Sequence, residues 1–503
     1  MCRYRYVGEM RVALVSTYEL GHQPLHVASP AATLLRAGNE VRCMDLAVQP
    51  LDLDTIDWAD AVACSVPMHT AFRLARAVCS LVRLRRPGLP LCLYGLYAPL
   101  DGAMGSPLSA DFAIAGEYEP VLVSWVDRLA APDAERPHLV VARDRGRFGL
   151  PARHLLPGLE AYARAQILGE QRLAGYVEAS HGCAHRCRHC PVPVVYDGRT
   201  RLVGEDAVVA DVGQLVALGA RHVTFGDPDF LNGPHHAARI MAAVHNAFPD
   251  LTFDVTVKVE HILRHRELWP SMADSGCVFA VSAFESASDA TLARLDKGHS
   301  VADAVEAVAV LRGARIEPRP SLLPFTPWTS GRDVFDLLDF VAACDLVGNI
   351  DAVQFAIRLL VPPGSLLLRS GALEGLTDDY DDEHLTWTWR SADSRLDDLQ
   401  ATLASVGERT ALEGWDARPT YDTVRATAIE ALADSGASRA SAPRPERRLR
   451  SSIPVDDRPR LTEPWFCCAE PNARQLRAVG AEPATAPPPP ANSAELETWA
   501  ATP

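Results

Sequence analysis

The stretch Cys183-Ala184-His185-Arg186-Cys187-Arg188-His189-Cys190 decides how the rest of the chain is interpreted. It follows an apolar run, residues 175–180, which predicts a strand, so the three cysteines lie on the loop that leaves this strand. Three thiolates on one short loop can bind three irons of a cubane cluster and leave the fourth iron without a protein ligand. Such an open position is a site for chemistry, as it is in catalytic zinc sites.

A zinc site is the alternative for this loop, because His185 or His189 could complete a Cys/His ligand set. No second CxxC pair follows nearby, which favours the cluster. The CxxxCxxC spacing resembles the cluster loop of the radical SAM superfamily. The resemblance implies a [4Fe-4S] cluster held by Cys183, Cys187 and Cys190, whose open iron binds S-adenosylmethionine (SAM). His189 stands where the family usually has an aromatic residue near the adenine.

Upstream of this loop, the chain alternates short apolar strands with helices. A parallel, doubly wound sheet is therefore expected, with ligands at the carboxyl ends of its strands. The predicted domain covers residues 1–135, with strands at 11–16, 40–45, 61–66, 91–95 and 111–116 and helices at 30–37, 70–84 and from 117 to about 130.

This first domain resembles the cobalamin-binding domains that precede many radical SAM domains. The resemblance rests on the order of the elements, on Gln23-Pro24-Leu25 and on Gly116-Glu117-Tyr118-Glu119. The Asp-x-His-x-x-Gly motif that supplies an axial histidine is absent from the sequence. Many members of that group also lack the motif, so bound cobalamin and a scaffold without cobalamin both stay open.

After a predicted interdomain connection (residues 136–170), residues 171–365 repeat a strand-helix unit. Six such units suit a partial (β/α)6 barrel, whose active site lies at the carboxyl ends of the strands. The predicted strands are 175–180, 222–227, 252–257, 278–284, 315–323 and 353–359.

Polar residues at these strand ends are the candidate cofactor ligands. The resemblance places Glu285 and Ser286 near the ribose and amino acid parts of SAM, and Asp227 in the wall of the cavity together with Asp229. Arg319 and Arg358 interrupt or end two strands, where a cation can pair with a carboxylate. The alternative for each residue is a helix cap or an interdomain salt bridge.

The chain beyond the barrel is predicted as a small helical cap (residues 366–435, with helices at 391–407 and 420–434) and a flexible tail (436–503) rich in Ser, Ala, Pro and Arg at its start. The tail carries Cys467-Cys468-Ala469-Glu470-Pro471. Together with the cluster loop, this motif resembles the CUAEP/CCAEP-tail radical SAM (seleno)protein family, in which some members have selenocysteine at the position of Cys468. A soft nucleophile or ligand is therefore expected there.

Cys467 and Cys468 are thus candidate catalytic residues. They could hold a thiophilic atom, cycle between dithiol and disulfide, or act as a thiolate nucleophile or hydrogen-atom donor. The alternative is a buried structural pair or a docking motif. We expect the two cysteine groups to meet in one cavity.

The resemblance implies an enzyme that reductively cleaves SAM and modifies a small-molecule substrate by radical chemistry, with a flavodoxin or ferredoxin as reductant. One alternative is 3-amino-3-carboxypropyl or methyl transfer to a thiophilic element such as arsenic. A non-enzymatic alternative is an iron-sulfur redox or sensor protein. A tRNA methylthiotransferase shares the two-domain order but would need a basic, RNA-binding C-terminal part.

Composition limits the partners and the location. The net charge of −15 argues against a nucleic-acid partner. No run of about twenty apolar residues predicts a membrane helix. Seven of the twelve cysteines lie scattered outside the two groups, which does not suit a disulfide framework and predicts a cytoplasmic protein.

Overall fold

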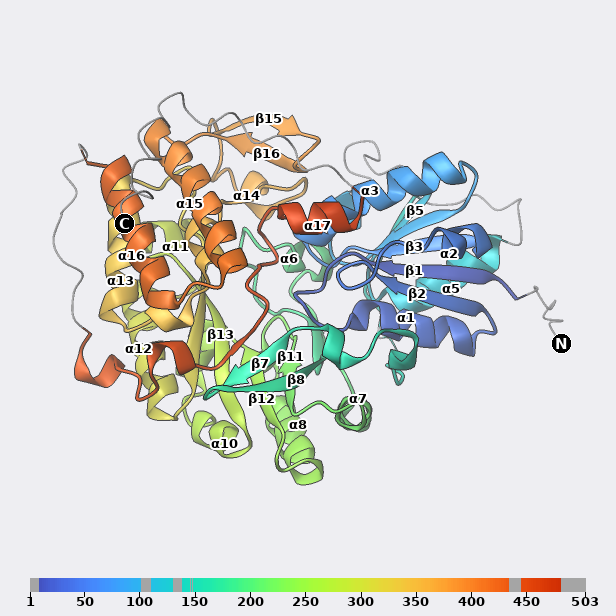
Figure 1. Ribbon diagram of the computed structural model, residues 1–503, viewed down its shortest axis with the longest axis horizontal. Helices are drawn as coiled ribbons and strands as arrows, with labels where there is room; N and C mark the ends of the chain where they lie inside the picture. Colours follow the sequence, from blue (N-terminus) through green and yellow to red (C-terminus); the bar gives the residue numbers. More distant parts are fainter. Residues whose placement is uncertain are drawn as a thin grey trace, which may run out of the picture.

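The computed structural model describes residues 9–100, 110–129, 138–144, 146, 148–433 and 445–480. Two α/β parts lie side by side, and the end of the described chain passes between them (Figure 1). Residues 436–444 and 481–503 of the predicted tail lie outside the described residues. Within the described part, no helix is both long and apolar enough to cross a membrane.

The first part is a six-stranded sheet in the order β2-β1-β3-β4-β5-β6, with every pair of neighbours parallel. This confirms the predicted doubly wound sheet. Apolar clusters fill both faces of the sheet, which is why its strands read as continuous apolar runs. The strands are β1 (Arg11–Ser16), β2 (Glu40–Asp45), β3 (Ala61–Ser65), β4 (Leu91–Tyr94), β5 (Phe112–Gly116) and β6 (Leu139–Ala142), and the helices are α1 (Leu25–Arg36), α2 (Leu53–Trp58), α3 (His69–Arg85) and α5 (Tyr118–Leu129).

Helix α1 begins five residues before the predicted start at Pro30, which lies inside the helix. A proline within a helix has no N–H to donate to the carbonyl four residues earlier, here that of His26. The Tyr94 hydroxyl donates to this carbonyl at 2.9 Å instead. A side chain from β4 therefore satisfies the oxygen that the proline leaves unpaired, and the helix continues through it.

The second part is a seven-stranded sheet, in the order β14-β13-β12-β11-β8-β7-β17, which curves into a nearly closed barrel. Its five parallel strands are β8 (Glu170–Val177), β11 (His222–Phe225), β12 (Thr252–Thr256), β13 (Cys277–Glu285) and β14 (Glu317–Leu322). The helices around them are α7 (Glu205–Ala217), α8 (Pro234–Ala247), α9 (Val259–Arg264), α10 (Trp269–Asp274), α11 (Asp289–Leu295), α12 (Val301–Gly313) and α13 (Gly331–Ala343).

The predicted sixth strand, residues 353–359, is wrong. It is replaced by a 3-10 helix, Ala352–Ala356, followed by one isolated parallel bridge between Phe325 and Arg358. The Gln354 amide oxygen accepts the backbone N–H of Leu322 at 3.0 Å. This side chain thus pairs with the end of β14, where a sixth strand would have offered a backbone carbonyl.

The predicted connection and the predicted tail both contribute to the two sheets. Residues 136–170 provide β6 to the first sheet and β7 (Arg164–Ile167) to the second. Strand β17 (Arg460–Leu461) pairs antiparallel with β7, which itself pairs antiparallel with β8. The expectation of a flexible tail therefore differs from the structure over residues 445–480, where the chain extends the barrel sheet.

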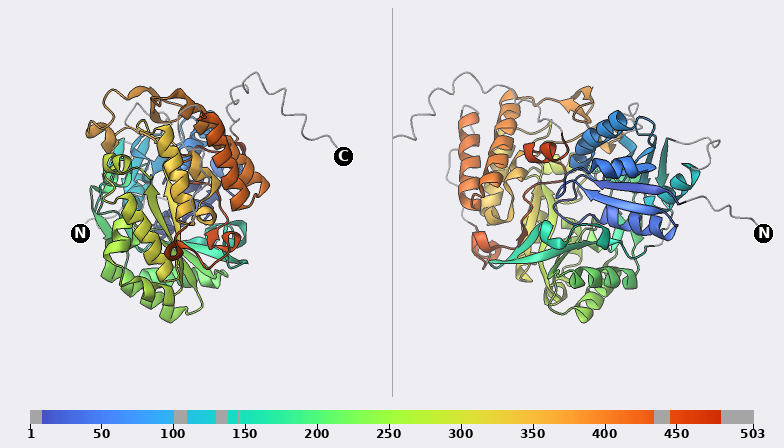
Figure 2. Two further views of the ribbon diagram at one scale, coloured as in Figure 1. Left: turned by 90° about the vertical axis from the view of Figure 1, so that its left-hand side faces the viewer. Right: turned by 45° about the vertical axis from the view of Figure 1, so that its right-hand side comes forward.

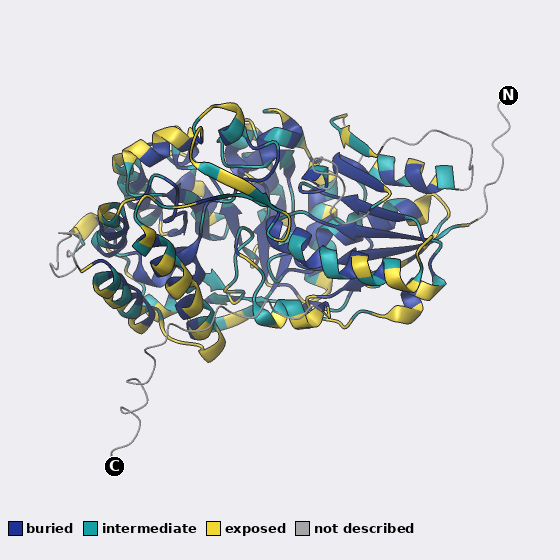
Figure 3. Ribbon diagram, turned by 90° about the horizontal axis from the view of Figure 1, so that it is seen from above, coloured by how far each residue is buried: buried dark blue, intermediate teal, exposed yellow. Residues whose placement is uncertain are grey.

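The predicted helical cap contains two helices, α15 (Ser394–Glu413) and α16 (Ala417–Ala431), and a hairpin that was not predicted. The hairpin joins β15 (Thr377–Asp381) and β16 (Thr386–Trp389), and its acidic residues Asp378 and Asp379 are exposed. The remaining elements are β9 (Ser180–Gly182), α6 (Val192–Tyr196), β10 (Thr200–Leu202), α14 (Leu366–Arg369) and α17 (Ala473–Ala478). Buried residues are concentrated on the strands of both sheets, and exposed ones on the outer faces of the helices (Figure 3).

Candidate active site

The cluster loop lies between β9 and α6, at the carboxyl ends of the barrel strands. Cys187 is buried, and Cys183 and Cys190 both pack against an apolar cluster that includes Val195 and Tyr196. Burial, together with the neighbouring thiols of Cys187 and Cys183, raises the pKa of Cys190 above its ordinary value. The three thiols are therefore close to one another on one half-buried loop, which fits a [4Fe-4S] cluster.

Both histidines of the loop face protein carboxylates, which argues against the zinc alternative. His189 Nε2 lies 3.0 Å from Glu285 Oε1, and His185 Nε2 lies 3.6 Å from Asp229 Oδ2. Asp229 also contacts His261, whose Nδ1 lies 2.8 Å from the same Oδ2 atom. Neither histidine is therefore placed as a fourth ligand beside the thiols.

The group His185, Asp229 and His261 has donor atoms within 4.8 Å of one another, a spacing that could hold a metal ion. However, the Lys258 ammonium lies 3.2 Å from His185 Nδ1 and adds a positive charge beside these atoms. Although burial opposes ionisation, the two histidines lower the pKa of Asp229. We therefore assign the group to holding the cluster loop against β11 and α9.

Glu285 joins the cluster loop to the end of β13. Its Oε1 accepts from His189 Nε2 at 3.0 Å and from Lys297 Nζ at 3.0 Å. Although burial opposes ionisation, Lys297 and His189 hold the pKa of Glu285 far below its usual range. The residue also has a positive φ of 63°, a strained backbone conformation that is common at functional sites. Sequence reasoning missed Lys297 as a site residue, since the only signal was its position just after α11.

A cavity of about 500 Å³, the inner cavity, lies between the barrel, the first domain and the tail. The barrel contributes His189, Cys190, Glu285 and Arg319 to its wall, the first domain contributes residues such as Tyr97, and the tail contributes Trp465, Phe466, Cys467 and Cys468. The His189 Nδ1 atom is buried in this wall without a hydrogen-bond partner among the residues that the structure describes. A buried polar atom left unpaired beside the cluster loop fits a bound polar cofactor such as SAM.

The tail pair lies in the same cavity wall as Cys190, as the sequence predicted. Cys467 Sγ and Cys468 Sγ are 3.6 Å apart, and both thiols are free. The hydrogen bond with Cys467, together with burial, raises the pKa of Cys468 well above its ordinary value. Cys468 is therefore held as a thiol in the wall of the inner cavity, beside the Cys467 sulfur.

Helix α3 of the first domain holds the tail pair in place. The Thr70 hydroxyl donates to the carbonyl oxygens of Ala469 at 2.8 Å and Cys467 at 3.2 Å. Glu470 binds His69 Nε2 at 3.0 Å and Arg73 Nε at 2.8 Å. Although burial opposes ionisation, these two partners lower the pKa of Glu470 to about 2. The acidic residue of the tail motif is thus an anchor, and Figure 2 shows this segment between the cap and the first domain.

The other predicted site residues have different positions. Asp227 lies outside the cavity wall formed by the described residues, since its carboxylate accepts the Ala179 N–H at 2.8 Å and the Ser180 hydroxyl. Burial raises the pKa of Asp227 to about 7. Ser286 also lies outside this wall, and its hydroxyl accepts the Ser288 N–H at 3.1 Å. Arg319 does line the cavity, paired with Asp351 at 2.9 Å.

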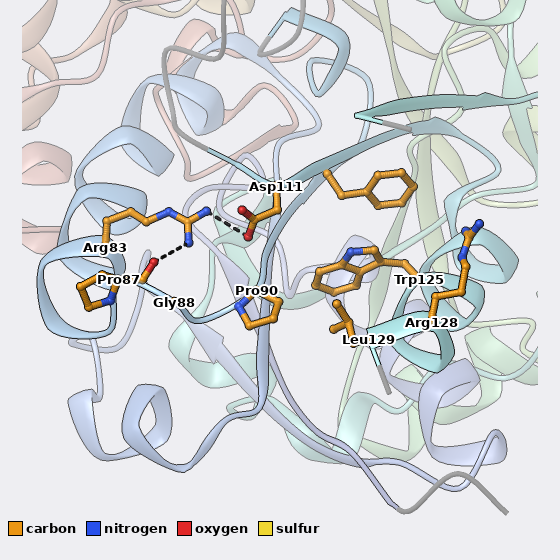
Figure 4. A pocket seen from close by; sticks show the side chains of 9 residues that line it. Arg83, Pro87, Gly88, Pro90, Asp111, Trp125, Arg128 and Leu129 are labelled. Atoms are coloured by element: carbon orange, nitrogen blue, oxygen red, sulfur yellow. Dashed lines mark hydrogen bonds and ion pairs between the residues drawn. The ribbon is translucent and has the colours of Figure 1, made fainter. Parts of the chain in front are cut away.

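A smaller cavity of about 180 Å³ lies on the first domain, between α3 and α5 (Figure 4). Arg83 and Asp111 form an ion pair at 3.0 Å in its wall, beside Trp125. Its lining contains no cysteine or histidine among the described residues, so it offers no ligand for the chemistry of the cluster loop.

Comparison with known proteins agrees with this geometry. Residues 177–341, from the end of β8 to α13, match the profile of the radical SAM superfamily. This part of the chain is a radical SAM domain. The cluster loop, Glu285 and Lys297 all lie within the matched residues.

Curated relatives of the radical SAM domain have different reactions. A tRNA-2-methylthio-N(6)-dimethylallyladenosine synthase of Pelodictyon phaeoclathratiforme is 28% identical over 200 residues, which are 37% of this chain and 44% of that protein. A hopanoid C-2 methylase of Rhodopseudomonas palustris is 26% identical over 193 residues, covering 38% of this chain and 34% of that protein. The chain thus spans less than half the length of these curated relatives.

Solved structures share the arrangement of the two domains. The cobalamin-dependent SAM radical enzyme OxsB superposes with a TM-score of 0.63 at 13% identity, covering 85% of this chain and 72% of that one. The radical SAM methyltransferase TsrM from Kitasatospora setae gives a TM-score of 0.52 at 19% identity, covering 66% of this chain and 70% of that one. At these identities the likeness concerns the fold, an N-terminal parallel sheet followed by a radical SAM barrel.

Proposed function

We propose that the protein is a radical SAM enzyme that modifies a small-molecule substrate in the inner cavity, with Cys467 and Cys468 taking part. Cys183, Cys187 and Cys190 would hold a [4Fe-4S] cluster, reduced by a flavodoxin or ferredoxin. When bound, such a cluster would supply the electron for reductive cleavage of a carbon–sulfur bond of SAM. His189, Glu285 and Arg319 would bind and orient SAM, with the Glu285–Lys297 pair fixing His189 against the cavity.

One observation supports this proposal most strongly, namely that Cys190 and the tail pair line one cavity although they are far apart in the sequence. The tail is tied there by three neighbouring side chains of α3, His69, Thr70 and Arg73. A segment that served only to cover the barrel would not need two free thiols facing the cavity. A catalytic role explains both why these thiols lie in the same cavity wall as Cys190 and why the segment carries two reactive sulfurs.

The first test is SAM cleavage by protein reconstituted anaerobically with iron and sulfide, reduced by dithionite. We expect 5′-deoxyadenosine and methionine, or methylthioadenosine if the 3-amino-3-carboxypropyl bond breaks. The variants Cys467→Ser and Cys468→Ser are expected to keep SAM cleavage within about threefold, since neither residue is a cluster ligand, and to lose substrate modification. Absence of all three SAM products in the wild-type protein would favour the iron-sulfur redox or sensor alternative.

A second candidate is transfer of a 3-amino-3-carboxypropyl or methyl group to a thiophilic element such as arsenic. The 3.6 Å separation of the two free tail thiols favours it, because a single soft atom can bridge two adjacent thiolates. The same motif supports our proposal that the chain belongs to the CUAEP/CCAEP-tail radical SAM family. In this reaction the tail pair would hold the acceptor atom while the radical forms beside Cys190.

Cobalamin does not fit this arrangement. Ligands of doubly wound sheets bind at the carboxyl ends of the strands. Here the tail covers these ends, because Glu463 accepts from Tyr18 just after β1 at 3.2 Å, and Cys467 and Ala469 accept from Thr70 after β3. The remaining volume of about 500 Å³ lies in the range of ordinary small-molecule sites and would be taken up by SAM and a substrate. The proposed function therefore has no step that uses cobalamin.

We expect hydroxocobalamin to separate completely from the reconstituted protein on gel filtration. The control is free hydroxocobalamin run with bovine serum albumin, which sets the background of non-specific retention. About one cobalamin retained per chain would show that the tail moves aside. Cobalamin would then be a cofactor of the proposed reaction.

A further inference from the structure

Cys468 lines a second cavity in addition to the inner one. This outer cavity, also of about 500 Å³, lies between the tail, the hairpin β15–β16 and helix α15. The two cavities adjoin each other, and the residues common to both linings are Ile357, Arg358, Leu359, Leu360, Trp465 and Cys468. Cys468 is thus the only cysteine of the described chain that lines both cavities.

We infer that the outer cavity is the site where an uncharged, thiol-reactive small molecule binds before it bonds to Cys468 and Cys467. The inference rests on the role of the tail pair in the proposed function and names the class of substrate and its route. The inner cavity is expected to hold SAM beside Cys190, so a second reactant needs an approach from another side. The outer cavity provides such an approach, and it leads to the same Cys468 thiol that lines the inner cavity.

The lining of the outer cavity favours a neutral ligand. Three tryptophans, Trp387, Trp389 and Trp465, form much of its surface. Most charged groups in the wall pair with opposite charges, and Glu408 accepts the backbone N–H of Ala473 at 3.2 Å. Arg358 pairs with Asp397 at 2.6 Å and lies over the Trp389 ring, and His384 pairs with Asp381 at 2.7 Å.

Glu470, the remaining anchored acid of this wall, is bound to His69 and Arg73. An anionic ligand would thus find no unpaired cation among these groups, whereas a neutral one meets aromatic surface. The inferred ligand has to be uncharged and thiol-reactive. An uncharged trivalent metalloid oxide meets both requirements, since it carries no charge and reacts with dithiols.

The reaction with the pair is a condensation without electron transfer. Both S–H bonds break, two sulfur–metalloid bonds form, and the oxide oxygen leaves as water with the two thiol protons. The distance of 3.6 Å between the sulfurs lets one atom bridge both. No oxidant or reductant is required, and the product places the metalloid in the wall of the inner cavity.

The test uses phenylarsine oxide as the probe, with free thiols counted and the modified peptide mapped by mass spectrometry. We expect one probe per chain on Cys467 and Cys468, at a rate that saturating SAM does not change. Ala404 lines the outer cavity from α15, so Ala404→Trp should fill it and slow labelling at least tenfold. Ala401→Trp, on the exposed face of the same helix and outside the lining, is the matched control and should label like the wild type.

Ser405→Trp is a second blocking variant, in case Ala404→Trp fails to fold by circular dichroism. Protection of the tail thiols by SAM would overturn the inference, because the probe would then enter through the inner cavity. Equal labelling of the blocking and control variants would overturn it as well. Labelling does not require SAM cleavage, so failure of this inference is distinguishable from failure of the proposed function.

Discussion

Substitution of Cys187 by alanine is expected to remove the cluster and to lower SAM cleavage by at least about a thousandfold. Cys187 is the most buried of the three loop thiols, and it lies near both Cys183 and Cys190. Two thiolates on the loop would leave two irons without protein ligands, so the cluster would lose its attachment. Iron and sulfide per chain, the visible charge-transfer absorption and the yield of 5′-deoxyadenosine measure the effect.

The matched control is Cys344→Ala, which also removes a buried thiol from the barrel part. Cys344 follows α13 and lies outside the lining of the inner cavity, so iron content and SAM cleavage should stay near the wild-type values. The substitution removes only a small apolar contact and should cost about 1 kcal/mol of stability. A Cys187→Ala protein that keeps its iron would contradict our assignment of the cluster ligands.

The largest effect on stability is expected for Asp211→Ala. Arg153 is almost fully buried and donates from Nε and Nη2 to the two carboxylate oxygens of Asp211, at 2.6 and 2.7 Å. Its guanidinium also donates to Gln23 Oε1 at 3.2 Å and to the Tyr176 carbonyl at 2.7 Å. Removal of the carboxylate leaves a buried charge without its partner, which typically costs about 3–5 kcal/mol.

Urea unfolding monitored by circular dichroism and tryptophan fluorescence measures this loss. Gln23 belongs to the first domain, while Asp211 lies on α7 of the barrel, so the two domains are also expected to unfold in separate transitions in the variant. Asp206→Ala on the exposed face of the same helix is the control and should cost less than about 1 kcal/mol. If both variants lose the same stability, the buried ion pair does not join the domains.

The sequence predicted those features that depend on residues close together in the chain. The parallel strands of both sheets were predicted because buried strands are continuous apolar runs, and the cluster loop was recognisable because its three cysteines are within eight residues. Predictions based on position in a strand were weaker. Asp227 lies at a strand end as expected, yet its carboxylate turns toward Ala179 and Ser180 and away from the cavity.

The features that the sequence did not predict depend on long-range contacts. The sixth barrel strand is absent because the Gln354 side chain takes over a hydrogen bond of β14, which no hydrophobic pattern records. The order of the tail depends on partners about 400 residues earlier, such as Thr70 for Ala469. Composition alone indicated flexibility there, because it contains no information on what a Ser- and Pro-rich segment meets in the folded protein.

The pairing of β17 with β7 has a consequence for biosynthesis. The ribosome releases the residues of the barrel before it releases Arg460, so the newly made barrel has its cluster loop open to the surroundings for part of translation. When the end of the chain emerges, β17 pairs with β7 and the tail motif docks on α3, which closes the cavity beside the cluster loop. The order of the chain thus sets an order of assembly, with the dithiol added last.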